Sequence, residues 1–129
     1  MVEGYLTQEM QKVGADLTAS LDQASLDIKA ALWFFEPEHR AWRLLFATPR
    51  LKSDGPRHVY RTIQSVMTKA KDRFRDLSLQ DIKAVSPDDP LVSLLRLALR
   101  TGPGIAGIRF SRNAINGHLV EDAYIYRLN

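Results

Sequence analysis

The chain has 129 residues, of which 45% are hydrophobic, and a net charge of +3. This composition is too apolar for a disordered chain, and the length suits one domain, residues 1–129, with a core of its own. The lack of cysteine excludes disulfides, thiolate chemistry and the common structural zinc sites.

No apolar run is long enough to cross a membrane as a helix. The first residues, Met1 to Tyr5, lack the basic segment followed by an apolar one that marks a secretory signal. We therefore expect a cytoplasmic protein of bacterial type with no membrane partner.

Apolar residues recur at spacings of three and four over residues 6–24, which predicts an amphipathic helix. Thr7 is placed to cap its start. Gly14 lies in the middle of this helix, where glycine costs about 1 kcal/mol relative to alanine.

From Leu26 the spacing changes to two, which predicts a hairpin with strands over 26–35 and 42–47 around the loop 36–40. We expect one face of this hairpin to pack against helices through Leu32, Phe34, Leu44 and Phe46. The opposite face then carries Trp33, Phe35, Arg43 and Leu45.

Asp54-Gly55-Pro56 predicts the start of a second helix, with Asp54 as cap and apolar residues recurring as far as Phe74. Residues 79–85 predict a short strand. Ser86-Pro87-Asp88-Asp89-Pro90 then predicts a third helix, which ends before Gly102-Pro103-Gly104.

Residues 105–128 predict a closing hairpin, because Asn116-Gly117 is the strongest short-range signal for a two-residue turn. This turn sets the register, in which the numbers of opposed residues sum to 233. One face carries Ile108, Phe110, Ala123 and Ile125 and is the expected core face. The other is polar and aromatic, and carries Arg109, Ser111, Asn113, Val120, Asp122, Tyr124 and Tyr126.

The order of elements is α-β-β-α-β-α-β-β. It predicts an α+β fold with a mostly antiparallel five-stranded sheet and with helices packed on one face.

The leading candidate site is the sheet face that this arrangement leaves open. Tyrosine and arginine are enriched in binding hot spots, so we expect this face to bind a partner or a small ligand. Its predicted residues are Trp33, Phe35, Arg43, Arg109, Ser111, Asn113, Asp122, Tyr124 and Tyr126. The alternative is a partly solvated face with no binding function, on which Asp122 only forms a hydrogen bond with Ser111 across the strands.

Two large aromatic side chains, Trp33 and Phe35, are expected to lie together on that open face. Clustered exposed aromatic residues usually mark an interface. They are buried either inside the monomer or in a homodimer, and a twofold dimer joined sheet to sheet would cover them together with the tyrosines of the last hairpin.

A second candidate is a basic stripe on the second helix. Residues 50–75 contain eight basic and two acidic residues, and Arg57, Arg61, Lys69 and Arg73 recur at multiples of four. Such stripes contact phosphates in nucleic-acid-binding proteins. An ordinary solvated helix face is the alternative.

A third possibility is a small-ligand enzyme with Asp122 as general base and Arg109 orienting an anion. It requires that burial beside Tyr124 and Tyr126 raise the pKa of Asp122. We assign no catalytic residue, because no motif supports one, and we expect no cofactor. We expect no metal either, because His39, His58 and His118 lack ligand spacing.

The closing residues resemble uncharacterised bacterial proteins of the integron or mobile gene cassette type. The resemblance rests on four segments: Thr101-Gly102-Pro103-Gly104-Ile105, Gly107-Ile108-Arg109-Phe110-Ser111, Ile115-Asn116-Gly117 and Glu121-Asp122-Ala123-Tyr124-Ile125-Tyr126-Arg127-Leu128. It implies a compact accessory protein that is often oligomeric. The sequence as a whole favours a non-enzymatic, homodimeric binding protein.

Overall fold

The computed structural model describes residues 5–129, except the side chains of Arg112 and Asn113. Its helices and strands follow the predicted order, with three short helical turns added. They are α1 (Gln8–Gln23), β1 (Ala30–Glu36), β2 (Ala41–Ala47), α2 (Arg50–Ser53), α3 (Pro56–Lys69), α4 (Lys71–Phe74), the 3₁₀ turn η1 (Leu79–Asp81), β3 (Ile82–Val85), α5 (Pro90–Ala98), β4 (Ile108–Ile115) and β5 (His118–Leu128).

The five strands form one sheet in the order β3-β2-β1-β5-β4. Three of the neighbouring pairs are antiparallel, whereas β2 and β3 run parallel, so the sheet is mixed. The predicted α+β class and mostly antiparallel sheet are confirmed. In the part of the chain that the structure describes, no helix has both the length and the apolar character needed to cross a membrane.

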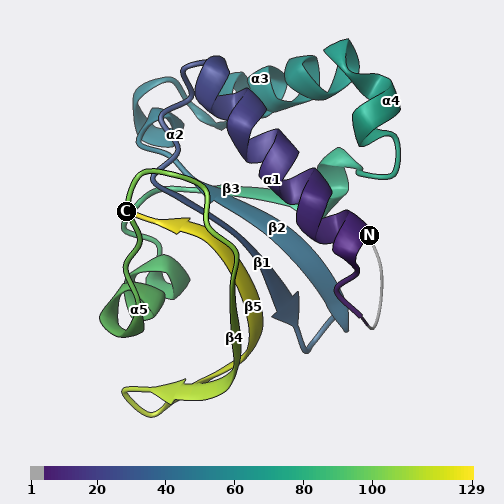
Figure 1. Ribbon diagram of the computed structural model, residues 1–129. Helices are drawn as coiled ribbons and strands as arrows, with labels where there is room; N and C mark the ends of the chain where they lie inside the picture. Colours follow the sequence, from purple (N-terminus) through teal and green to yellow (C-terminus); the bar gives the residue numbers. More distant parts are fainter. Residues whose placement is uncertain (1–4) are drawn as a thin grey trace.

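Helices cover both faces of the sheet, and not one face as the sequence predicted (Figure 1). One core contains α1, α3 and α4 with Trp33 and Leu44, and the other contains α5 with Leu32 and Leu45. The reason lies in the central strands, which are apolar at consecutive positions. Such strands have two faces to bury, and α5 buries the second one.

The closing hairpin has the predicted turn and register. Asn116 and Gly117 both have positive φ, at 49° and 77°, which a two-residue hairpin turn of this type requires. The opposed pairs include Ile108 with Ile125, Phe110 with Ala123 and Ser111 with Asp122. The expected core face of this hairpin faces α5, and Ala123 and Ile125 are fully buried there.

Several predicted boundaries are wrong for local reasons. β1 begins at Ala30 and not at Leu26, because Ser25 and Asp27 turn the chain with φ near 59°. The cap of α3 is Gly55, while Asp54 closes α2 and pairs with Arg50 at 3.2 Å.

Two longer helices end earlier than predicted. The second helix breaks at Ala70, whose φ of −126° is not helical, and continues only as the single turn α4. The third helix, α5, ends at Ala98, and no helix extends from there to the glycines after Thr101.

Helix α1 approaches the sheet closely at Gly14. The Trp33 indole N–H donates to the Met10 carbonyl at 3.0 Å, and the Tyr126 hydroxyl donates to the Gln11 carbonyl at 2.6 Å. A Cβ atom on residue 14 would overlap the Tyr126 hydroxyl and would lie 2.7 Å from the Trp33 Nε1 atom. The glycine that weakened the helix prediction therefore permits the helix to dock. Thr7 caps this helix as predicted, by accepting from the Met10 N–H at 3.1 Å.

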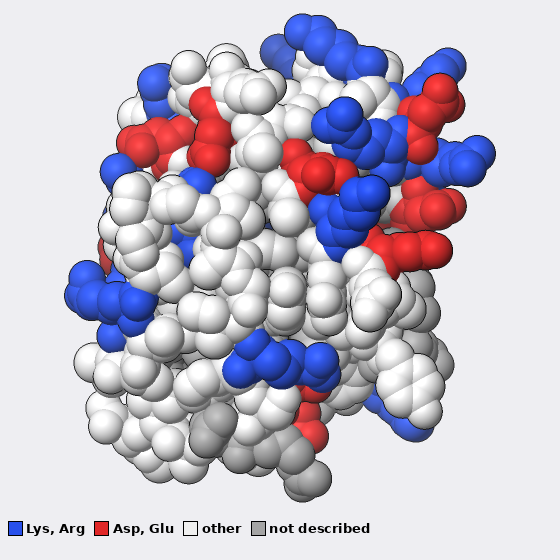
Figure 2. All heavy atoms as spheres, in the orientation of Figure 1, with Lys and Arg blue, Asp and Glu red and all other residues white. Residues whose placement is uncertain are grey.

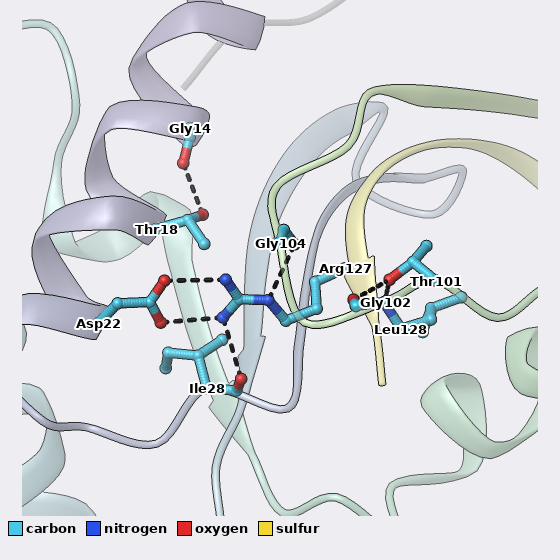
Figure 3. Close-up of polar contacts among 9 residues, drawn as sticks. All are labelled: Gly14, Thr18, Asp22, Ile28, Thr101, Gly102, Gly104, Arg127 and Leu128. Atoms are coloured by element: carbon cyan, nitrogen blue, oxygen red, sulfur yellow. Dashed lines mark hydrogen bonds and ion pairs between the residues drawn. The ribbon is translucent and has the colours of Figure 1, made fainter.

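Arg127 clamps the other end of α1 to the sheet (Figure 3). The pairing of β1 with β5 shifts by one residue between Ala31 and Leu32, and a bulge of this kind redirects side chains. Arg127 donates two hydrogen bonds to the Asp22 carboxylate, at 2.9 and 2.8 Å, and others to the carbonyls of Ile28 and Gly104. Only 6% of its side chain is exposed. The clamp joins α1, the entry to β1 and the loop before β4.

The close approach at Gly14 predicts that Gly14→Ala destabilises the protein. Alanine normally stabilises a helix interior by about 1 kcal/mol relative to glycine, whereas overpacking a filled core costs about 1–3 kcal/mol. We expect a net loss in the free energy of unfolding, measured with urea. Gly102→Ala is the matched control, because a Cβ there meets nothing within 4 Å. A more stable Gly14→Ala protein would contradict the docking.

Candidate functional site

The polar-aromatic face of the last hairpin carries an ion pair with two hydrogen bonds. The Arg109 guanidinium donates to the Asp122 carboxylate through Nε at 2.7 Å and through Nη2 at 2.6 Å. Ser111 donates to the same carboxylate at 2.8 Å. The guanidinium carbon also lies 5.5 Å from the centre of the Trp42 ring. The sequence thus correctly placed Arg109, Ser111 and Asp122 together.

The aromatic part of the predicted face is covered. Trp33 and Tyr126 are 0% and 1% exposed, because α1 lies over them and accepts hydrogen bonds from both. Phe35 and Tyr124 are half-buried. The prediction that all four lie on an open face is wrong for Trp33 and Tyr126. Burial inside the monomer accounts for them, and homodimerisation stays a prediction.

Arg43 does not share a face with Trp33. It pairs with Phe34 across the β1–β2 hairpin, whereas Trp33 pairs with Leu44. The prediction grouped β2 with the wrong face of β1, because a strand that is apolar on both faces gives no signal for its orientation. Arg43 forms an ion pair with Glu36 at 3.3 Å.

Two further residues were predicted for the polar-aromatic face, and the structure bears on one of them. The side chain of Asn113 lies outside the described residues. Val120 is buried in the core that contains α5.

Asp122 does not have the raised pKa that a general base needs. Partial burial raises the pKa of this carboxyl, but the hydrogen bonds from Arg109 and Ser111 outweigh burial and bring it below its ordinary value. The carboxylate is therefore charged near neutral pH and engaged by two donors. This arrangement matches the alternative prediction of a hydrogen-bonded Asp122 better than the enzyme prediction.

The basic stripe is only partly assembled. Arg57, Arg61 and Lys69 are exposed on α3, whereas Arg73 lies beyond the break at Ala70. Arg73 instead lines a hollow between α1 and α4, where Asp16 is among the acidic neighbours. Figure 2 shows positive and negative side chains intermixed on the side of the molecule where α4 lies. The nucleic-acid interface stays an untested prediction.

A cleft opens where the two hairpins diverge. β1 and β5 pair as far as Phe34 and Ala123, and beyond this pair the hairpins separate at the bottom of Figure 1. The cleft has a volume of about 340 Å³. Its lining combines apolar residues of α5, β1 and β5 with acidic ones: Phe34, Phe35, Glu36, Pro37, Glu38, Leu91, Leu94, Leu119, Val120, Glu121 and Asp122.

This lining leaves apolar surface exposed and carries charge of one sign. The Leu119 side chain is among the most exposed large apolar groups, at 62%, and Leu91 and Leu94 are half-buried. All four charged residues of the lining are acidic, although the chain as a whole is basic. Arg43 forms an ion pair with Glu36, and Arg109 forms one with Asp122.

Of the residues that line this cleft, only Phe35 and Asp122 were predicted to belong to a site. Leu91 and Leu94 recur at helical spacing in the predicted third helix, as ordinary core residues do. A signal was present in α5, because Leu97 continues the row of Leu91 and Leu94, and the apolar arc is then wider than one packed face needs. Leu97 is 64% exposed. The divergence of the strands had no local signal.

Comparisons with protein-family models, with curated proteins and with solved structures find no match to this chain. The resemblance to gene-cassette proteins therefore stays a prediction. Among the described residues, no group of three or more histidine or acidic side chains is arranged to hold a metal ion.

The ion pair predicts how Asp122 titrates. Removing the guanidinium in Arg109→Gln should raise the pKa of Asp122, which carboxyl NMR measures directly. A lowered folded-state pKa stabilises the protein above the unfolded value of about 3.9, and this contribution is lost as the pH falls. Wild type should therefore lose more stability than Arg109→Gln on acidification below about pH 4. Arg57→Gln, on α3, is the control and should leave the Asp122 titration unchanged.

Proposed function

We propose that this protein is a non-enzymatic binding protein that captures a protein partner in the cleft between its two hairpins. The observation that carries the proposal is the divergence of β1 and β5 beyond Phe34 and Ala123. It leaves apolar side chains of α5 and β5 accessible at the end of the sheet.

Coverage elsewhere supports this choice of surface. α1 closes the aromatic face, and α5 closes the centre of the opposite one. Monomeric proteins seldom leave a contiguous apolar surface open unless it binds something. The cleft is concave and mostly apolar, with a few polar groups at its rim, as binding sites usually are.

The enzyme alternative has less support. Its proposed base, Asp122, is held by Arg109 and Ser111, and its pKa is lowered. A general base near neutrality needs a raised pKa and access to a substrate proton. Asp122 serves the proposed function as a fixed charge at the edge of the cleft.

The proposal predicts that peptides selected for binding from a random library will require Leu119. A library of random peptides displayed on phage is selected on the immobilised protein. Leu119→Gln should lower the affinity of the enriched peptides by about tenfold, because each peptide loses the burial of one leucine side chain. The loss should appear as a higher Kd in fluorescence polarisation.

Leu97→Gln is the matched control, because Leu97 is equally exposed but lies outside the cleft. Enriched peptides should bind this variant as they bind wild type. The proposal fails if no peptide is enriched, or if the peptides bind both variants equally well.

A further inference from the structure

We propose that the partner is an extended peptide segment that adds a strand to the free end of β5 and carries alternating apolar and basic side chains. This inference rests on the proposed function and specifies the chemistry of the partner. It follows from the backbone register, the lining of the cleft and the sign of its charge.

The backbone register is the first argument. In a hairpin closed by a two-residue turn, the flanking pair is hydrogen-bonded, here Ile115 with His118. Alternate residues of β5 therefore direct their N–H and C=O groups away from β4. Ala123 and Ile125 direct them to β1. Leu119 follows the same alternation and directs its backbone groups into the cleft.

The length of the two strands is the second argument. β5 extends for five residues, 118–122, beyond its last pair with β1, whereas β1 extends only through Phe35 and Glu36. A segment of another chain can therefore continue along β5 in line with β1. Extended peptides bind many sheet edges in this way, through main-chain hydrogen bonds.

The lining specifies which side chains such a peptide carries. Successive side chains of a strand point to opposite sides. One set would pack on Leu91 and Leu94 of α5, which calls for aliphatic residues. The charged residues that line the cleft are all carboxylates, and Arg43 and Arg109 neutralise two of them. Glu38 lies in the β1–β2 loop and is exposed, whereas the other three acidic residues of the lining are partly buried. The exposed carboxylate of Glu38 therefore calls for lysine or arginine in the other set.

A short capped peptide of alternating valine and lysine tests the inference, with isothermal titration calorimetry as the measurement. We expect it to bind the wild-type protein, and we expect a peptide with glutamate in place of lysine to bind at least about tenfold more weakly. Glu38→Lys should lower the affinity for the lysine peptide about fivefold, a typical effect of exposed charges. Glu9→Lys, which makes the same change of charge on α1, should leave the affinity unchanged.

Main-chain pairing is tested by N-methylation of alternate peptide amides. Methyl groups along the edge that faces β5 should abolish binding, whereas the same number along the other edge should not. Equal binding of all methylated peptides overturns the inference, and so does a preference for the glutamate peptide.

The peptides selected from the phage library distinguish failure of this inference from failure of the proposed function. Cleft binders that require Leu119 but are acidic, or that tolerate methylation on either edge, overturn the inference while the proposed function stands. Absence of any peptide that requires Leu119 overturns both.

Discussion

Helix α1 reaches the sheet only because residue 14 has no side chain. The space that a Cβ would fill is occupied by the ends of Trp33 and Tyr126. These two side chains donate to carbonyls one turn earlier in the helix, so two large aromatic groups of the sheet have polar partners as well as apolar contacts. Arg127 then holds the last turn of the helix through Asp22. The position of α1, and with it the closure of one face of the sheet, depends on this contact at Gly14.

Closure of that face determines where the protein can bind. Helix α1 covers the surface around Trp33 and Tyr126, and α5 covers the middle of the opposite face. The accessible part of the sheet is therefore its far end, where the hairpins diverge. There the ion pair of Arg109 and Asp122 lies beside an apolar cleft with an acidic rim. The same packing that makes the core thus leaves a binding surface at the end of the strands.

The sequence predicted what local chemistry decides. Asn116 and Gly117 set the turn, and the turn set the register that brings Ser111 and Arg109 to Asp122. Prediction from the sequence failed where packing between distant segments determines the structure. β1 and β2 are apolar on both faces, so alternation could not tell which face receives α1. Nothing near Arg127 in the chain announced its partner Asp22, which lies 105 residues away. The cleft was missed because strand divergence is a property of two hairpins and not of either sequence.

Closure of the aromatic face within one chain is tested most directly by the accessibility of Trp33. The chain has two tryptophans, so Trp42→Phe leaves Trp33 as the only indole, and acrylamide quenching of its fluorescence can be followed on dilution. If α1 of the same chain covers Trp33, quenching stays weak and does not change from high to low protein concentration. Quenching that becomes strong on dilution would show that a second copy covers Trp33, and would contradict closure by α1.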